Sequence, residues 1–462
     1  MVRITRRSLL ASALAGAGSA LSPALAADAE PTTTLRLHRR TLEVNGRAAS
    51  VYGIAQPNGM HGATFRVGDR FRVRVENRIA EPSLIHWHGL TPPWRQDGVP
   101  GISGPPIPPG QSADYDFPLD FGGTFWMHSH QGLQEQLLMS APLIIHDDRD
   151  EAREQEVVLM LHDFSFTPPE EIYAKLRAPA KVTDMAIKPR ADRGPDLNDV
   201  AYDAFLANDR TLADPETVKI EPGERALLRV INGSAMSNFH LDLGALDGEL
   251  IAVDGFRVKP VAGKSFPVAV AQRLDIRLRL PAGAAAYPVL ATLEGTARRT
   301  GIVLDAGGPI LRIGETADQP SPAITLDLER RLEAAGPLRP RKADRVHRLD
   351  LTGDMAKYVW SINNVVWAED IPPLAVAEGE RVELVLTNKT MMPHPMHLHG
   401  HEFQVVEIDG ERISGAVRDT ILVRPRGQVI VAFDANNPGW WAFHCHLLYH
   451  LEAGMFTTIS YM

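Results

Sequence analysis

One segment occurs three times along the chain and restricts the fold more than any other feature of the sequence. Each copy is a Gly-acid turn followed by a strand-like apolar run that ends at Asn. The copies span residues 67–77, 221–232 and 378–388, and their glycines recur at intervals of 155 and 156 residues. A glutamine that opens a second strand-like run recurs at nearly the same period, as Gln111, Gln272 and Gln428. Two elements that share one period predict a single domain present in three copies.

The rest of the sequence predicts an all-β protein. Short β-rich runs alternate with Gly, Pro and Asn turns, and long helical periods are few. We expect domain boundaries near 148–155 and 308–345. These boundaries divide the mature chain into domains at 28–150, 151–310 and 311–462.

Two segments depart from this pattern. The Pro- and Arg-rich residues 319–345 are expected to form a long, exposed linker before the third domain. Residues 165–180 contain Pro168-Pro169-Glu170-Glu171. They are expected to insert a short helix in the second domain, with proline in its first turn.

The first 27 residues indicate an export signal. Arg6 and Arg7 precede an apolar run from Leu9 to Leu25, and small residues mark a cleavage site near Ala26. The run is too short and too weakly apolar for a membrane anchor. Its start resembles signals of the twin-arginine type, which export proteins already folded. We therefore expect a periplasmic protein that binds its metal before export and is not inserted in a membrane.

Composition adds two constraints. The chain carries 57 acidic against 48 basic residues, and three of the basic ones lie in the export signal. Such a balance gives no reason to expect nucleic acid or an anionic membrane as partner, and we expect a monomer. Cys445 is the only cysteine. Because it cannot form an internal disulfide, a role as metal ligand is favoured.

Eight of the 17 histidines form four His-x-His pairs, namely His86 and His88, His128 and His130, His397 and His399, and His444 and His446. Alternate side chains of a strand share a face, so the two rings of a pair lie about 6.5–7 Å apart along the chain. Two pairs belong to the first predicted domain and two to the third, whereas the corresponding stretches of the middle domain keep only His240. We expect the first and third domains to share a multinuclear metal cluster, with the middle domain as a spacer.

Cys445 also indicates a second, mononuclear site. A thiolate, two imidazoles and a weak thioether ligand form the blue-copper arrangement. His450 and Met455 follow Cys445 closely, and His394 is the remaining histidine near the motifs. Neighbours of a strand-borne residue point to the opposite face. The two histidines that flank Cys445 should therefore serve the cluster.

Four motifs occur in order along the chain: HWHG at 86–89, HSH at 128–130, HPMHLHG at 394–400 and HCHLLYHLEAGM at 444–455. Together they resemble the motifs of multicopper oxidases, which include laccases, ascorbate oxidases and copper-efflux oxidases. The resemblance covers essentially the whole mature chain and is nearest to exported bacterial members of the copper-tolerance and manganese-oxidation type. It implies three cupredoxin-like Greek-key barrel or sandwich domains and a laccase-like oxidoreductase of copper homeostasis.

The resemblance also implies four copper ions. The type 1 ion would be bound by His394, Cys445 and His450, with Met455 as axial ligand. The type 2 ion would be bound by His86 and His397. The type 3 pair would be bound by His88, His128, His130, His399, His444 and His446. In this family a reducing substrate gives up single electrons at type 1 copper, and dioxygen is reduced to water at the other three ions. The substrate would be a phenol, an aromatic amine, or a metal ion such as Cu(I) or Mn(II).

Asp97 matches the acidic residue that the family places near type 2 copper, and we expect it to supply protons there. Leu451 stands where some bacterial relatives carry a glutamate, and Glu452 should face elsewhere, so a second proton source is not identified. Mainly structural roles are expected for Asp419, Trp126, Trp440, Trp441, Met391, Met392 and Met396. The three methionines could instead guide Cu(I), because thioethers prefer the cuprous ion.

One alternative belongs to another functional class. A copper-binding or electron-transfer protein of copper homeostasis would carry copper without turnover. Such a protein needs only His394, Cys445, His450 and Met455, so the eight further imidazoles argue against it. A copper nitrite reductase also uses type 1 copper, but it would not need four His-x-His pairs.

Overall fold

The computed structural model of the chain describes residues 32–147, 154–178 and 197–462. The predicted export signal at 1–27 lies outside the described residues, as do residues 148–153 at the first predicted boundary. The chain from Thr33 to Met462 forms one compact unit. Among the described residues, no helix has the length and apolar character needed to span a bilayer.

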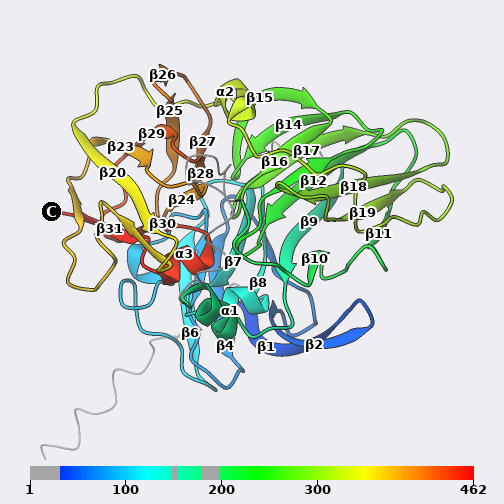
Figure 1. Cartoon of the computed structure of the whole chain (residues 1–462), viewed down its shortest axis with the longest axis horizontal. Helices are drawn as coiled ribbons and strands as arrows, with labels where there is room; N and C mark the ends of the chain where they lie inside the picture. Colours follow the sequence, from blue (N-terminus) through cyan, green and yellow to red (C-terminus); the bar gives the residue numbers. More distant parts are fainter. Residues whose placement is uncertain (1–31, 148–153, 179–196) are drawn as a thin grey trace, which may run out of the picture. The chain divides into compact units, whose positions relative to one another are not determined.

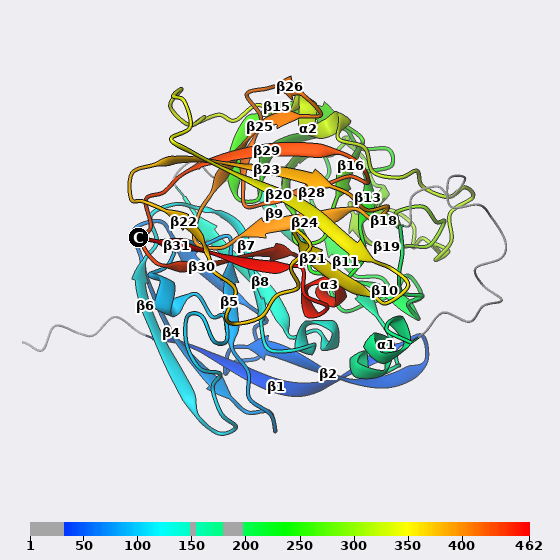
Figure 2. The same ribbon diagram turned by 60° about the vertical axis from the view of Figure 1, so that its left-hand side comes forward.

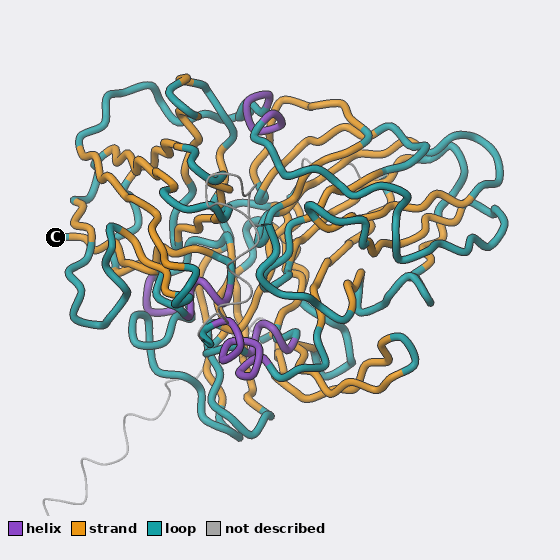
Figure 3. Tube along the Cα trace, viewed as in Figure 1, coloured by secondary structure: helices purple, strands orange, loops and turns teal. Residues whose placement is uncertain are grey.

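Strands dominate the described chain and its helices are short (Figure 3), which confirms the prediction of an all-β protein. Within the described ranges the strands form six sheets, and these sheets group into three pairs along the sequence. In Figure 1 the first pair runs from blue to cyan, the second is green, and the third runs from yellow to red.

The first pair consists of sheet β2-β1-β4-β6 and sheet β3-β8-β7-β5. Its strands are β1 (Thr33–Val44), β2 (Arg47–Ala55), β3 (Ala63–Arg66), β4 (Arg70–Asn77), β5 (Ile85–His88), β6 (Ser112–Pro118), β7 (Gly123–Ser129) and β8 (Ser140–His146). Buried side chains from both sheets, among them Leu35, Phe71, Trp87 and Phe125, form one apolar core.

The second pair consists of sheet β10-β9-β12-β17-β14-β15 and sheet β11-β19-β18-β13-β16. Its strands are β9 (Gln155–Phe164), β10 (Ala204–Ala207), β11 (Thr217–Lys219), β12 (Arg225–Asn232), β13 (Phe239–Asp242), β14 (Gly248–Val253), β15 (Phe256–Gly263), β16 (Ser265–Val268), β17 (Arg273–Arg279), β18 (Ala286–Leu293) and β19 (Arg299–Asp305).

The third pair consists of sheet β21-β20-β23-β29-β25-β26, with β27 also paired to β25, and sheet β22-β31-β30-β24-β28. Its strands are β20 (Arg345–Asp354), β21 (Val359–Ile362), β22 (Leu374–Val376), β23 (Arg381–Asn388), β24 (His394–Leu398), β25 (Phe403–Ile408), β26 (Glu411–Arg412), β27 (Val417–Arg418), β28 (Thr420–Val423), β29 (Gln428–Asp434), β30 (Trp440–Cys445) and β31 (Phe456–Tyr461).

The repeated sequence segment forms the same strand in each pair of sheets. In all three copies this strand, β4, β12 or β23, pairs in parallel with an earlier strand and antiparallel with the strand opened by the repeated glutamine. The terminal asparagines, Asn77, Asn232 and Asn388, each donate side-chain hydrogen bonds to two backbone carbonyls. The repeat ends at Asn because its amide fixes the loop that follows the strand.

The helices lie between strands. They are the α-helices α1 (Pro169–Leu176), α2 (Asp327–Arg331) and α3 (Leu448–Glu452), and the 3-10 turns η1 (Trp94–Gln96) and η2 (Gln134–Leu137). Helix α1 begins at Pro169, as expected for residues 165–180. The second linker, expected to be exposed, is exposed over much of its length but not throughout. It carries α2, and Ile324, Leu326 and Leu332 in it are buried, because apolar side chains among its prolines and arginines pack against the second and third pairs of sheets.

Candidate metal centres

Strand pairing separates Cys445 from the histidines that flank it. Strands β24 and β30 run antiparallel, with Cys445 opposite Met396 and His444 opposite His397. Because side chains alternate along a strand, the sulfur of Cys445 lies on one side of this sheet. The imidazoles of His444 and His446 lie on the other side, as their contacts below confirm.

Three ligand atoms converge on the Cys445 side. The sulfur of Cys445 lies 3.6 Å from His394 Nδ1 and 3.8 Å from His450 Nδ1, and the two nitrogens are 3.2 Å apart. Strand β24 supplies His394 and helix α3 supplies His450. Met455 is buried, and its backbone carbonyl accepts a hydrogen bond of 3.1 Å from the Cys445 amide. The structure thus brings His394, Cys445 and His450 together, with the Met455 backbone beside Cys445.

The protonation states at this location suit a soft metal ion. Burial, with a contribution from the neighbouring His450, holds the pKa of His394 well below its ordinary value. Burial also lowers the pKa of His450. Neutral imidazole is the form that binds metals, and two imidazoles with a sulfur ligand are the donor set that suits copper.

The eight paired histidines form one cluster between two sheets. Strands β5 and β7 bring four of them, and strands β24 and β30 bring the other four at or just beyond their ends. Strands β5, β7, β24 and β30 lie close together in Figure 2, and ring contacts join the histidines of the two sheets. The His88 and His397 ring centroids are 3.7 Å apart, and those of His86 and His399 are 3.9 Å apart. In this arrangement, histidines of the first and third pairs of sheets are in contact.

The inward nitrogens of this cluster fall into three groups. His86 Nε2 and His397 Nε2 are 3.4 Å apart. The second group joins His130, His399 and His444, with Nε2 separations of 3.4 Å and 2.9 Å from His444. The third group is His88 Nδ1, His128 Nε2 and His446 Nε2, three buried nitrogens without a hydrogen-bond partner in the described chain.

Unpartnered nitrogens are the test of whether metal ions fit here. A buried polar atom without a partner costs about 1–3 kcal/mol, and three of them lie in one histidine cluster. Burial holds the pKa values of His88, His128 and His446 well below the ordinary range. These rings are therefore neutral and have lone pairs to donate. The residues present fit a multinuclear site for metals that prefer imidazole.

Most of the outward nitrogens are held by oxygen acceptors, as is usual for metal-binding histidines. Backbone carbonyls accept from His86, His397 and His444 at 2.8, 3.0 and 2.9 Å. Carboxylates accept from two of the others. His399 Nδ1 donates to Asp97 Oδ2 at 2.8 Å, and His88 Nε2 donates to Asp419 Oδ1 at 3.0 Å.

Asp97 lies beside two of the paired histidines. It is buried and contacts two imidazoles, because its second oxygen, Oδ1, is 3.2 Å from His86 Nδ1. Asp419, expected to be mainly structural, also contacts two imidazoles, those of His88 and His397. Glu452 is exposed, in keeping with its expected orientation.

Two acidic residues at the sites were missed by the sequence reasoning. Glu135, in η2, lies with Oε2 2.7 Å from His128 Nδ1 and Oε1 4.0 Å from His446 Nδ1. Asp199 accepts hydrogen bonds from His450 Nε2 at 3.0 Å and from Tyr358 at 2.7 Å. Neither lies in a histidine motif. The only signal for Glu135 is its position five residues after His130.

The aromatic and methionine residues near the motifs pack as expected. Trp126 stacks on His128 with ring centroids 4.3 Å apart, and Trp441 is fully buried. Met392 and Met396 belong to the apolar core. Met391 differs, since its sulfur accepts a hydrogen bond from Arg426 at 3.4 Å.

Comparison with known proteins agrees with this geometry. Three family models, each described as multicopper oxidase, match residues 38–150, 155–305 and 340–461. The multicopper oxidase MmcO of Mycobacterium tuberculosis is 31% identical over 458 residues, which cover 93% of this chain and 87% of that protein. A copper resistance protein A homolog of Pseudomonas syringae pv. tomato is 28% identical, with 86% of each chain covered.

Solved structures share the fold. Fet3p, a multicopper oxidase that functions in iron import, superposes with a TM-score of 0.78 at 20% identity and covers 93% of this chain and 90% of its own. The multicopper oxidase of Pseudomonas thermotolerans gives a TM-score of 0.72 at 25% identity, with 94% and 99% covered. The expected cupredoxin-like fold is confirmed, and the alternative of a copper carrier without turnover is not favoured. The chain belongs to the multicopper oxidase family and is a copper-dependent oxidoreductase that couples oxidation of a substrate to the reduction of dioxygen.

Proposed function

We propose that the chain binds four copper ions at the two locations described above. His394, Cys445 and His450 would hold the type 1 ion, with Met455 as axial ligand. His86 and His397 would hold the type 2 ion. The type 3 pair would be held by the two groups of three histidines, which are His130, His399 and His444, and His88, His128 and His446. The observation that carries this proposal is the set of three unpartnered, neutral imidazole nitrogens in the cluster.

Copper, when bound, would supply the redox chemistry, taking single electrons from a substrate and passing four of them to dioxygen to form water. The protein's own residues fix where this happens. Cys445 belongs to the first site through its sulfur, and its two sequence neighbours belong to the second. The backbone from residue 444 to 446 is therefore a direct covalent connection between the sites.

Asp199 lies beside a proposed ligand of the type 1 site, where the reducing substrate would give up its electrons. The side chain of Asp199 covers His450 Nε2 and is itself only 1% exposed. The Asp199 oxygen that contacts His450 Nε2, Oδ2, also accepts from Tyr358, so Asp199 holds the His450 ring from within the protein. A phenol, an aromatic amine, or a metal ion such as Cu(I) or Mn(II) is proposed as the reducing substrate from the family resemblance.

Oxygen consumption by copper-loaded protein tests the function. We expect about four copper ions per chain and oxygen uptake with at least one of a phenol, an aromatic amine, Cu(I) and Mn(II). Hydrogen peroxide should not accumulate, because all four electrons go to water. Full copper loading without uptake on any of the four donors would contradict an oxidase role.

Replacing Asp97 should affect dioxygen reduction at the histidine cluster and leave the type 1 site unchanged. Asp97→Asn keeps a carbonyl oxygen for His399 but removes the charge and the capacity to carry a proton. We expect the blue absorption of the type 1 site to stay unchanged, while dioxygen reduction slows by about 10²–10⁴-fold, the usual contribution of a general acid. Rapid mixing of reduced enzyme with dioxygen measures this step. Wild-type reoxidation in the variant would rule out the role.

The remaining features of the proposal concern organisation and place. Three domains at 28–150, 151–310 and 311–462 are supported by the three family matches and the three pairs of sheets. We also propose, from the sequence alone, that a twin-arginine signal exports the protein to the periplasm and that the protein is a monomer. Copper homeostasis as the setting is supported by the similarity to copper resistance protein A homologs.

A further inference from the structure

The middle pair of sheets supplies a buried arginine to the edge of the histidine cluster, although its described residues provide none of the proposed ligands. Arg273 opens strand β17 and is fully buried. Its Nη1 donates to Asp419 Oδ1 at 2.9 Å, and its Nη2 donates to Asp419 Oδ2. Two parallel hydrogen bonds of this kind fix the plane of a carboxylate as well as its position.

The other side of Asp419 faces the histidines. Oδ1 accepts a hydrogen bond from His88 Nε2 at 3.0 Å and lies 3.5 Å from His397 Nδ1. The opposite nitrogen of His88, Nδ1, is one of the three unpartnered atoms in the cluster. The ring of His88 is thus held at its outer nitrogen by a carboxylate whose orientation is set by Arg273.

Arg273 itself has no freedom to move. All five of its N–H donors have acceptors, since Nε donates to Thr124 O, Nη1 also donates to Ala271 O, and Nη2 also donates to Asp254 O, at 2.9–3.1 Å. A guanidinium has five donors in a fixed fork, so this site matches it completely. A lysine would leave acceptors unpaired.

The ion pair of Arg273 with Asp419 explains why the HWHG motif ends in glycine, Gly89. A Cβ at Gly89 would lie 2.5 Å from Arg273 Nη2 and 2.8 Å from Asp419 Oδ2, and the backbone there has φ +90°. Any side chain at this position would push the ion pair away from the histidines. The motif therefore encodes space for an arginine that comes from nearly 200 residues later in the chain.

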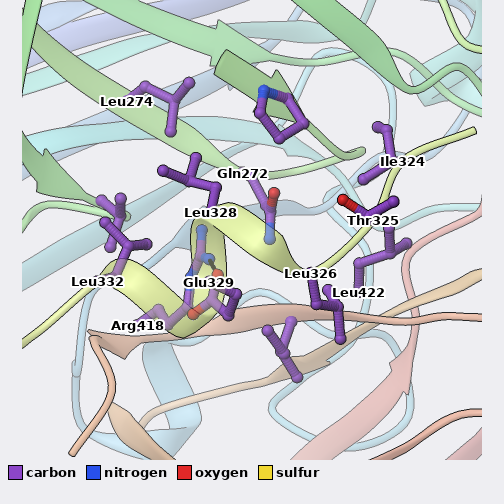
Figure 4. Close-up of a pocket in the computed structure, with 13 residues that line it drawn as sticks. Gln272, Leu274, Ile324, Thr325, Leu326, Leu328, Glu329, Leu332, Arg418 and Leu422 are labelled. Atoms are coloured by element: carbon purple, nitrogen blue, oxygen red, sulfur yellow. Dashed lines mark hydrogen bonds and ion pairs between the residues drawn. The ribbon is translucent and has the colours of Figure 1, made fainter. Parts of the chain in front are cut away.

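A second buried group braces the first. Arg418, next to Asp419, donates to Glu329 of α2 (Figure 4) and to Asp254 Oδ2 at 3.0 Å. Asp254 Oδ1 in turn accepts from the Arg273 amide at 2.9 Å. The cavity beside this group is about 20 Å³, which is room for about one water molecule. Apart from this small cavity, the linker, the second pair of sheets and the third pair of sheets pack closely together here.

Charge keeps the arrangement ionic. The Arg273 guanidinium donates two hydrogen bonds to the Asp419 carboxyl group, and His88 Nε2 donates a third. Asp419 is consequently a carboxylate that accepts hydrogen bonds, as its contacts with His88 and Arg273 require.

We propose that Arg273 is a positioning residue for the copper cluster, which acts by holding Asp419 against His88 and His397. The middle domain is then a part of the cluster's support and not only a spacer. This inference rests on the proposed copper-binding roles of those two histidines. It predicts that loss of the guanidinium changes the cluster while the type 1 site stays as it is.

Arg229 offers a matched control. It is also a buried arginine of the middle sheets, on the adjacent strand β12, and it also contacts Thr124, through the side-chain oxygen at 3.2 Å. Its ion pairs go to Glu156 and Asp275. Arg229→Met therefore removes a comparable buried charge from the same interface without touching the Asp419 pair.

The test uses full-length copper-loaded protein with Arg273→Met, Arg273→Lys and Arg229→Met. Electron paramagnetic resonance resolves type 1 and type 2 signals, and competition with a chelator of known affinity measures copper binding. For Arg273→Met we expect wild-type blue absorption, an altered type 2 hyperfine splitting, and cluster affinity for copper about 10- to 100-fold weaker, the usual effect of losing a residue that orients metal ligands. Arg273→Lys should be intermediate, and Arg229→Met should resemble wild type.

Each outcome has one meaning. Wild-type protein without a type 2 signal would overturn the proposed function itself. Wild-type protein with four copper ions, together with a wild-type type 2 spectrum in both Arg273 variants, would overturn the inference alone. An equal change in Arg229→Met would also overturn it, because the effect would then be general to the domain. If Arg273→Met fails to fold, Arg273→Lys decides.

Discussion

A Cys445→Ser variant is expected to fold and to lose the blue absorption, one of four copper ions, and oxidase turnover. Cys445 is fully buried, and its sulfur lies within 3.8 Å of both imidazole nitrogens at the type 1 site. A serine hydroxyl is a harder and weaker ligand than a thiolate. We expect turnover to fall by on the order of 10³-fold or more, as for any group used in every catalytic cycle.

Copper content, visible absorption and oxygen uptake measure these three effects in one preparation. Met396→Leu is the control, because Met396 pairs with Cys445 across β24 and β30 and is equally buried. This conservative change should keep the blue absorption. A serine variant that stays blue would show that Cys445 is not the sulfur ligand.

Removing the Glu135 carboxyl group is expected to weaken copper binding at the histidine cluster. Glu135→Leu takes away the acceptor that lies 2.7 Å from His128 Nδ1 and 4.0 Å from His446 Nδ1. The outer nitrogen of the buried His128 ring would lose its short contact with Glu135, which would cost about 1–3 kcal/mol for a nitrogen left unpaired. We expect copper affinity at the type 3 pair to fall about 10- to 100-fold.

Two further variants separate ligand support from general stability. Glu135→Gln keeps an oxygen that can accept from His128, so its copper affinity should lie nearer to wild type. Glu294→Leu removes another buried carboxylate, which contacts Asn238 and not the histidines, and it should bind copper normally. Chelator competition reports affinity, and thermal unfolding of copper-free protein reports stability. Normal copper binding by Glu135→Leu would contradict the proposed support.

The fold was predictable to the extent that it is periodic. Strand alternation and a repeat of about 155 residues were sufficient to predict three β units, the side of the strand on which each histidine lies, and the separation of Cys445 from His444 and His446. The repeated asparagines also have one function in all three copies. These features depend on neighbours in sequence, which a single chain displays directly.

The residues that support the ligands could not be predicted in the same way. Asp97 meets His399 across 302 positions, and His88 meets Asp419 across 331. Contacts at such separations are set by how the sheets pack, and they leave no local pattern. The sequence therefore contains no sign of the contacts made by Glu135, Asp199 and Arg273, which all lie outside the histidine motifs. The buried residues of the linker, Ile324, Leu326 and Leu332, were not predicted, because the surrounding Pro and Arg residues indicated an exposed segment.

The pairing of β24 with β30 has a consequence for the tolerance of this chain to insertions and deletions. A change of strand register by one residue turns every side chain to the opposite face. One residue added between Trp441 and Cys445 would direct the thiol towards the histidine cluster and two imidazoles towards the sulfur site. Point substitutions in this strand alter one site at a time, whereas a single inserted codon would exchange the chemistry of both.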